Sequence, residues 1–579
     1  MKYLTLSLLF FSMIGYSQNR ILVDGIFDEW SDYPITYSDA AGDGGFLGVD
    51  FGELQIYNDD EFIFFVLEFG SEINLQDMNE ISMYLDTDNN SNTGFAINGI
   101  GAELVYSFGD RSGLFYHSAG ASPISHPDIG LVTAPTVSSD QFEIAIKRNI
   151  SIAGNPVFSS DNVKIVFQNN ITNGDFLPAT NEEVIYTFSN DVLEPLPDYS
   201  IQKSNESDLR ILSYNVLSNG LFDTGRLPSL TRLLQAMQPD IIGFQEIYSY
   251  SSAEVANQME SILPSSAGQE WYHAKAGPDC HAISKYPILK NAEIQGSGNG
   301  AFLIDLPDTE TNLFLIVAHP PCCANNVERQ FEIDLMMEFL REAKAGNEPI
   351  PLEANTPIVI VGDMNLVGFN RQLETLLTGD ILDEVAHGSD FNPDWDGNNL
   401  LDSRPYVPGL PLSYTWYSEG SDFSPGNLDY IIYSGSNLIL QNSYSLFTPS
   451  LPQDSLNAFN LLTNDAVNAS DHLPVVADFE LKNLTSVKNP VAKNDFGILQ
   501  IYPNPSQGLT EIWINNPRQD FIAIQLIDLN GREVSMLHQG NLNVGEHMFR
   551  FDTSTFPSGM YFIQVKTAAL TDAKKIIIN

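Results

Sequence analysis

An apolar run in the middle of the chain, residues 357–361, predicts a strand that is covered on both faces. The run ends at Gly362, and a carboxylate and a carboxamide follow at Asp363 and Asn365. On an extended chain this spacing points both side chains the same way. Oxygen ligands at the carboxyl end of a buried strand suit a hard cation and a phosphate group, and a polar turn that closes a core strand has the same pattern.

The pattern of apolar and polar positions divides the chain into three folded parts. Residues 19–192 contain short alternating segments, such as 61–68, between turns rich in Gly and Asp, which predicts an all-β sandwich. Residues 208–481 alternate strand-like and helical segments and predict a single α/β domain. Residues 498–579 predict a short all-β tail. Two stretches with the composition of linkers, 193–207 and 482–497, separate these parts.

The first 17 residues have the pattern of a secretory signal peptide. Lys2 supplies the positive charge, residues 4–14 the apolar region, and residues 15–17 a cleavage site of mostly small residues. No later stretch is apolar enough over a sufficient length to predict a transmembrane segment. We therefore expect an exported protein that is secreted or attached to a cell surface.

Composition and charge narrow the class of protein. A hydrophobic content of 43% excludes a disordered chain. The formal charge of -47, from 27 basic and 74 acidic residues, repels polyanions and acidic membranes unless divalent cations intervene. Adaptation to a salty medium explains the same charge. The acidity weakens the case for tight binding of nucleic acid without deciding the chemistry.

The chain has three cysteines, Cys280, Cys322 and Cys323. Export permits a disulfide between Cys280 and one member of the adjacent pair, which would leave one thiol free. A zinc site is disfavoured because a structural site needs four ligands at recurring spacings.

Several predicted strands of the middle part end in, or begin next to, polar residues that a core does not need. These residues are Asn215, Gln245, Glu246, His319, Asp363, Asn365, Asp429, Asp471 and His472. If the strand ends converge on one edge of a sheet, the result is a divalent-metal site with two imidazoles for proton transfer. Any one of them alone reads as a strand cap or a structural histidine. Their number in one domain favours a catalytic site.

The motifs that carry these residues resemble, in the same order, the endonuclease/exonuclease/phosphatase superfamily, which includes deoxyribonucleases, abasic-site endonucleases, neutral sphingomyelinases and inositol-polyphosphate phosphatases. The motifs are Ser-Tyr-Asn at 213–215, Phe-Gln-Glu at 244–246, Ala-His at 318–319, Gly-Asp-Met-Asn at 362–365, Leu-Asp-Tyr at 428–430 and Ser-Asp-His at 470–472. The resemblance implies a four-layer α/β sandwich, in which two packed mixed sheets are flanked by helices and the active-site cleft lies at one edge.

The resemblance also implies roles for the matching residues. Asn215 and Glu246 bind Mg²⁺, or Mn²⁺ or Ca²⁺ in its place, and Asp471 completes that metal shell.

For catalysis, the same resemblance implies that Asp363 and Asn365 position the attacking water and a phosphate oxygen. His472, oriented by Asp429, is the base or the phosphate contact. His319 stabilises the developing charge or protonates the leaving oxygen. Such an arrangement neutralises a pentacovalent phosphorus while water attacks in line.

Two places depart from the family pattern. Cys280 and His281 stand where a family strand is usually small and apolar, and residues 320–323, Pro-Pro-Cys-Cys, replace the usual continuation after the histidine. Both lie near the expected cleft, so the substrate cannot be carried over from any one relative.

The first part resembles family-nine-like carbohydrate-binding modules, through residues 23–30, 86–90 and 93–94. This likeness implies contact with a glycan. Asp86, Asp88 and Asn90 alternate as the oxygen ligands of a structural calcium ion would, and a polar hairpin turn has the same pattern. Trp30 is expected to be a core residue.

The tail is similar to the type-A sorting domain of the type IX secretion system. The motifs lie at residues 501–508, 528–532 and 557–561, and a Lys-Lys pair is near the end. The resemblance implies passage through that secretion machinery across the outer membrane of a Bacteroidota-like bacterium, followed by removal of the tail.

Three hypotheses follow. The first is a secreted metal-dependent phosphoesterase that hydrolyses phosphodiester bonds, with extracellular nucleic acid as its substrate. The second keeps the chemistry and changes the substrate to a phospholipid, sphingomyelin or a small phosphomonoester. The third is a surface glycan-binding protein without catalysis. The retention of every motif residue argues against the third hypothesis.

Overall fold

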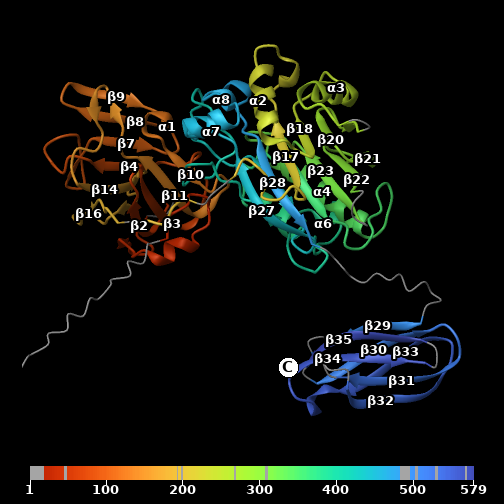
Figure 1. The fold of residues 1–579 in the computed structure, drawn as a ribbon. Helices are drawn as coiled ribbons and strands as arrows, with labels where there is room; N and C mark the ends of the chain where they lie inside the picture. Colours follow the sequence, from red (N-terminus) through yellow and green to blue (C-terminus); the bar gives the residue numbers. More distant parts are fainter. Residues whose placement is uncertain are drawn as a thin grey trace, which may run out of the picture. The chain divides into compact units, whose positions relative to one another are not determined.

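The computed structural model describes residues 19–482 and 496–578, except 45–48, 192, 197–199, 267–268, 307–310, 503–505, 507, 528–531 and 568–569. The predicted signal peptide therefore lies outside the described residues. The chain forms two compact units that divide after Lys482 (Figure 1). Within the described residues, no helix combines the length and the apolar character that crossing a membrane requires.

The first unit begins with an all-β sandwich, as predicted. One sheet has the order β1-β2-β3-β11-β10 and the other β15-β14-β4-β7-β8-β9, with β16 paired to β14. The strands of the first sheet are β1 (Tyr37–Ser38), β2 (Phe51–Asn58), β3 (Phe62–Ile73), β10 (Val132–Ala134) and β11 (Ser139–Lys147). Those of the second are β4 (Ile81–Asp86), β7 (Leu104–Ser107), β8 (Ser112–His117), β9 (Gly120–Ile124), β14 (Asn162–Asn169), β15 (Phe176–Leu177) and β16 (Val184–Thr187).

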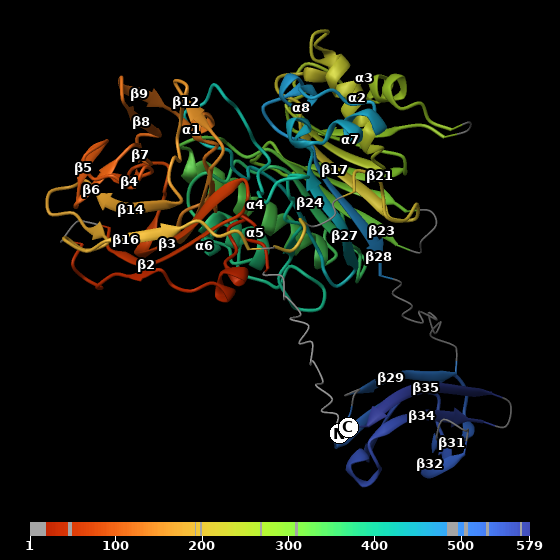
Figure 2. The same cartoon turned by 60° about the vertical axis from the view of Figure 1, so that its left-hand side comes forward.

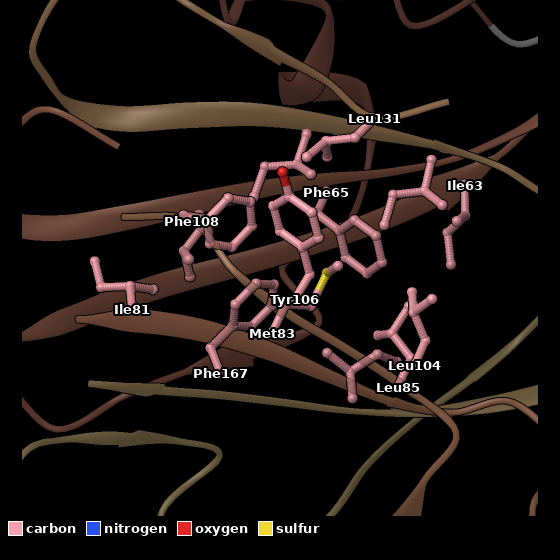
Figure 3. Close-up of a cluster of buried hydrophobic side chains, with 14 of the residues drawn as sticks. Ile63, Phe65, Ile81, Met83, Leu85, Leu104, Tyr106, Phe108, Leu131 and Phe167 are labelled. Atoms are coloured by element: carbon pink, nitrogen blue, oxygen red, sulfur yellow. The ribbon is translucent and has the colours of Figure 1, made fainter. Parts of the chain in front are cut away.

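Alternate residues of these strands meet between the two sheets. Ile63 and Phe65 of β3 contact the second sheet through a cluster that contains Met83, Leu104 and Phe167 (Figure 3). The shorter elements of the sandwich are η1 (Asp28–Asp32), α1 (His126–Ile129) and the two-stranded hairpins β5 (Phe95–Ile97) with β6 (Ile100–Ala102) and β12 (Ser151–Ile152) with β13 (Asn155–Pro156).

The middle of the chain has two mixed six-stranded sheets, β19-β20-β18-β17-β28-β27 and β21-β22-β23-β24-β26-β25. In each sheet one neighbouring pair is parallel, β17 with β18 and β23 with β24. The first sheet contains β17 (Leu209–Asn215), β18 (Ile241–Gln245), β19 (Tyr272–Ala276), β20 (Cys280–Ser284), β27 (Leu438–Ser445) and β28 (Val475–Leu481). The second contains β21 (Ile288–Glu293), β22 (Gly300–Asp305), β23 (Asn312–Ala318), β24 (Ile358–Asp363), β25 (Leu401–Asp402) and β26 (Asp429–Tyr433).

Helices cover the outer face of each sheet and complete the four predicted layers (Figure 2). The helices are α2 (Leu227–Met237), α3 (Ser252–Ile262), α4 (Asn326–Lys344), α5 (Arg371–Thr378), α6 (Glu384–His387), α7 (Gln453–Ala458) and α8 (Asp465–Ala469), with short turns η2 (Gly220–Phe222) and η3 (Thr448–Ser450). Between the sheets, a Cβ on Gly243 would lie 2.5 Å from a methyl group of Val361, so this position needs glycine. The close approach of the sheets brings their strand ends together at one edge.

The sandwich and the α/β part share a hydrophobic core. The outward face of β3, with Phe62, Phe64 and Val66, packs in one cluster with Leu412 and Leu473 of the α/β part. Residues 62–67 of β3 are therefore buried on both faces. Backbone hydrogen bonds add to this contact, since the Val23 N–H donates to the Pro411 carbonyl at 2.9 Å and Val23 accepts from Ser413 at 2.9 Å.

Trp30 lies in the same shared core and is 1% exposed. Its indole N–H donates to Oε1 of Glu143 at 2.8 Å. The prediction that Trp30 is a core residue is therefore confirmed, and its ring offers no platform for a sugar. The stretch predicted as a linker also contributes to the core, because Ile201 is buried against Leu212 and Tyr444.

All three cysteines are free thiols, so the disulfide that export would permit does not form. Cys280 is fully buried in the core between the two six-stranded sheets. Cys322 and Cys323 are exposed, with their Sγ atoms 2.6 Å apart. Burial of Cys280 inside the core is the physical reason that it does not pair with the exposed thiols.

The second unit is an all-β fold, as predicted for the tail. Its sheets have the orders β29-β30-β33 and β32-β31-β34-β35, and isoleucines such as Ile512, Ile524 and Ile563 form the core. The elements are β29 (Gly497–Tyr502), β30 (Leu509–Asn516), β31 (Asp520–Ile527), β32 (Glu533–Leu542), β33 (Gly545–Asp552), η4 (Thr553–Thr555), β34 (Gly559–Lys566) and β35 (Thr571–Ile578).

Candidate active site

The polar strand ends predicted from the sequence meet at one edge of the paired sheets. Asn215 ends β17, and Glu246 follows β18, its parallel neighbour. In the other sheet Asp363 ends β24 and lies opposite Asp429, the first residue of β26. Gly362 makes this strand end possible, because a Cβ there would lie 2.0 Å from the Ala318 carbonyl oxygen.

Asp363 is the hub of the site. Its Oδ2 accepts a hydrogen bond from Nδ2 of Asn215 at 3.0 Å. The same oxygen lies 3.6 Å from Nε2 of His319 and 3.5 Å from Nε2 of His472. Asp363 is 2% exposed, so its charge faces these groups and not solvent. One carboxylate thus connects residues that lie up to 257 positions apart in sequence, from Asn215 to His472.

His472 and Asp429 form a buried ion pair. Nδ1 of the ring lies 2.8 Å from Oδ2 of Asp429, which fixes the ring and directs Nε2 toward Asp363. Burial would lower the pKa of His472, but the charges of Asp429 and Asp363 outweigh it and raise the pKa to about 10. Burial raises the pKa of Asp429 to about 6, against the opposing effect of His472. In the metal-free protein the shared proton therefore resides on the imidazole.

His319 has a matching arrangement with a residue that the sequence analysis did not assign. Its Nδ1 lies 2.6 Å from Oδ2 of Asp279, which is buried just before β20. The same oxygen accepts the backbone N–H of Glu246 at 3.1 Å. Burial would lower the pKa of His319, whereas the hydrogen bond to Asp279 and the charge of Asp363 raise it to about 9. Through this one oxygen, Asp279 thus connects the His319 ring to the backbone N–H of Glu246.

Glu246 is held by donors at both carboxylate oxygens. Nδ2 of Asn215 lies 3.1 Å from Oε1, and the Ser218 N–H donates to Oε2 at 2.7 Å. Its φ of 62° is in the left-handed region, which a glutamate adopts at an energetic cost. Strain that the surrounding contacts maintain is common at functional sites.

Asn365 and Asp471 lie at the same edge with different contacts. The Asn365 N–H donates to Oδ1 of Asp363 at 3.0 Å, and its Nδ2 donates to the Pro320 carbonyl. Oδ2 of Asp471 accepts from the indole of Trp416 at 3.3 Å, and its Oδ1 is buried without a hydrogen-bond partner. Trp416 was not identified from the sequence, because it lies in a loop with no motif around it.

Three groups of Asp, Glu and His residues in the described part of the chain are close enough to share a metal ion. One consists of Asp363, Asp429 and His472 in this site. The others lie in the sandwich and consist of Asp39, Asp43 and Asp175, and of Asp86, Asp88 and Glu103. Of the predicted metal ligands, the structure brings Asn215 and Glu246 together, and Asp471 follows Ser470, whose hydroxyl donates to the Asn215 carbonyl at 2.9 Å.

The four-layer fold and the carboxylates and imidazoles at its edge define a phosphoesterase class of enzyme. Residues 212–472 match the model of the Endonuclease/Exonuclease/phosphatase family. Residues 500–579 match the model of the Secretion system C-terminal sorting domain. The middle of the chain is therefore an endonuclease/exonuclease/phosphatase domain, whose members are hydrolytic phosphoesterases. The tail is a type IX sorting domain, which directs export through the type IX machinery.

The comparison with curated proteins finds no match. Similar solved structures include the human Nocturnin catalytic domain with bound sulfate, which is 17% identical over 47% of this chain and 94% of that chain, with a TM-score of 0.30. The D. rerio TDP2 complex with a single-strand DNA product is 15% identical over 48% and 100%, with a TM-score of 0.31. Sphingomyelinase C from Streptomyces griseocarneus is 14% identical over 47% and 99%, with a TM-score of 0.29.

Proposed function

We propose that the chain is an exported, divalent-metal-dependent phosphodiesterase that acts on extracellular nucleic acid. The observation that carries this proposal is the position of Asp363, whose Oδ2 has the Asn215 amide and the two imidazole Nε2 atoms within 3.6 Å. An acid between two cationic rings suits a reaction that moves protons around a phosphate.

Asn215, Glu246 and Asp471 are the residues that would hold the metal ion. The chemistry of this set fits Mg²⁺, since all the ligand atoms would be oxygens, and the buried, unpartnered Oδ1 of Asp471 supports the assignment. When bound, Mg²⁺, or Mn²⁺ or Ca²⁺ in its place, supplies positive charge that neutralises the phosphate oxygens.

The remaining site residues supply positioning and proton transfer. Asp363 orients the attacking water and takes its proton, and Asn365 contacts a phosphate oxygen. His472, which Asp429 keeps protonated, donates a hydrogen bond to another phosphate oxygen. Water adds to phosphorus, the bond to the leaving oxygen breaks, and protonated His319 gives its proton to that oxygen.

A second candidate keeps this mechanism and changes the substrate. The net charge of -47 favours a zwitterionic lipid head group, such as that of sphingomyelin, or a small phosphate ester over a long polyanion. The sorting domain supports an extracellular location for either substrate. We propose further that a signal peptide at 1–17 starts export and that the mature protein is released or attached at the outer-membrane surface.

The test is a panel of substrates assayed with Mg²⁺, Mn²⁺, Ca²⁺ or chelator. The panel contains single- and double-stranded DNA, RNA, sphingomyelin, inositol phosphates and nitrophenyl phosphate esters. We expect metal-dependent degradation of nucleic acid by the wild type and its loss in His472→Asn. The exposed His273 of β19 provides the matched control, His273→Asn. Release of the lipid head group or the monoester alone would select the second candidate, and inactivity with every metal would contradict both.

A further inference from the structure

The second acidic group of the sandwich lies far along the chain from the catalytic residues and has its own geometry. Asp86 ends β4, Asp88 follows in the next turn, and Glu103 stands between β6 and β7. Each offers a carboxylate oxygen, and these oxygens lie within 4.8 Å of one another. Asp86 is 0% exposed and Glu103 is 7% exposed. Three carboxylates are thus gathered at the base of the β5–β6 hairpin.

The two deepest carboxylates each use one oxygen to hold the loop. Oδ1 of Asp86 accepts the Asn90 N–H at 3.0 Å, and Oε2 of Glu103 accepts the Thr87 N–H at 2.9 Å. The second oxygen of each, Oδ2 of Asp86 and Oε1 of Glu103, is buried without a hydrogen-bond partner. A buried oxygen with no partner is costly, and it is more costly on an ionised group.

Neighbouring charged side chains do not remove the free-energy cost of these buried, unpartnered oxygens. Lys164, which pairs with Asp86 across β14 and β4, forms an ion pair with Glu183. Burial raises the pKa of Asp86 and of Glu103, against the hydrogen bonds that lower it.

We infer that Asp86, Asp88 and Glu103 hold a divalent cation of the calcium class. The donor set consists of carboxylate oxygens alone, which suits a hard cation, and a loop site with several acidic ligands is typical of Ca²⁺. Asn90, which the sequence suggested as the third ligand, is exposed, and its Oδ1 accepts from Asn92. Glu103 takes its place in the cluster.

The ion would fasten the β5–β6 hairpin to the sandwich. The hairpin contributes Ile100 and Ala102 to a small cluster on the outer face of the second sheet, with Tyr84 and Val166. The loop before it turns tightly, since a Cβ on Gly101 would lie 2.1 Å from the Thr93 carbonyl oxygen. Asp86 precedes this loop and Glu103 follows the hairpin, so a cation that joins the two would close the whole segment and order the hairpin.

The test uses the full chain after removal of metals with a chelator, and CaCl₂ as the probe. Calcium bound per chain is counted by equilibrium dialysis. Ions at the catalytic site contribute equally to the count for every protein, so a difference between proteins reports on the sandwich. We expect Glu103→Gln to bind one calcium ion fewer than the wild type. Glu80→Gln changes an exposed glutamate next to β4 and should keep the wild-type count. Equal counts for the wild type and Glu103→Gln would overturn the inference.

Thermal unfolding of the same proteins gives a second readout. In chelator, Glu103→Gln should unfold at the same temperature as the wild type or higher, because one of three crowded negative charges is gone. In saturating calcium the wild type should unfold at the higher temperature. A variant that is less stable by the same margin in both conditions would contradict the inference. If Glu103→Gln does not fold, Asp88→Asn, whose side chain is partly exposed, replaces it with the same expected loss of one ion.

Discussion

Asp363 at the edge of the paired sheets and Asp86 in the sandwich are both carboxylates with almost no exposed surface. Asp363 has the protonated rings of His319 and His472 within 3.6 Å, together with the Asn215 amide. Asp86 has two further carboxylates beside it and an oxygen without a partner. The first group carries its own positive charge and can exchange protons, which suits catalysis. The second depends on a cation from outside, which suits a structural ion.

The largest expected effect is that of a change at Asp363, the central residue of the first group. Asp363→Asn removes the charge that connects Asn215, His319 and His472, and we expect turnover of the phosphodiester substrate to fall by about 10³-fold or more. Steady-state kinetics at saturating metal provide the measurement. Asp454→Asn, an exposed change in α7, is the control. Turnover near the wild-type value in Asp363→Asn would show that the reaction takes place elsewhere.

A smaller loss is expected at Asp279, which acts through His319. In Asp279→Asn, the carboxylate that holds Nδ1 at 2.6 Å is replaced by a neutral amide, so the pKa of His319 should fall. We expect turnover to drop by roughly 10–100-fold, as is common for residues that orient catalytic groups. The pH–rate profile should lose activity at a lower pH than in the wild type. A loss of turnover with an unchanged profile would mean that Asp279 only supports the fold.

The imidazoles should also make the stability of the metal-free protein depend on pH. The folded pKa values, about 9 for His319 and about 10 for His472, lie above the value of about 6.5 expected in the unfolded chain. Their contribution to stability is therefore complete below pH about 6.5 and declines as the pH rises through about 9 to 10. Thermal unfolding in chelator should show this decline, and His472→Asn should reduce it. An identical slope in the variant would argue against the charged pair.

The smallest effect is expected from the second group. Glu103→Gln should change turnover by less than about twofold with metal and calcium present, because an ion in the sandwich plays no part in the reaction. The same kinetic assay measures it beside Asp363→Asn. A large loss in Glu103→Gln would show that the two acidic groups are coupled and would remove the contrast between them.

The layers of the α/β part could be predicted from the sequence because strands such as 358–361 have an unbroken apolar pattern. The meeting of Asn215, Asp363 and His472 could be predicted because the first two end strands, His472 shortly precedes one, and the ends of packed sheets converge. Asp279 was not assigned, since it precedes its strand, and its role depends on the pairing of β20 with β18. Glu103 was missed for a similar reason, because a hairpin separates it from Asp86.

The contact between the sandwich and the α/β part was not predicted either. Its apolar residues on the α/β side, such as Leu412 and Leu473, lie in irregular segments without periodicity. On the sandwich side, Phe62 and Phe64 belong to a segment whose pattern predicted a strand but not what covers its second face. Only the folded chain brings these segments together.

This shared core has a practical consequence for anyone who prepares the enzyme. A fragment that starts at residue 208 would leave Leu412 and Leu473 uncovered, and exposed apolar surface of this kind promotes aggregation. The damage would also reach the chemistry, because Thr415, three positions after Leu412, accepts the backbone N–H of Asp429 at 2.8 Å, and His472 directly precedes Leu473. The amino-terminal sandwich therefore supports the fold of the hydrolase domain, and recombinant versions should retain it.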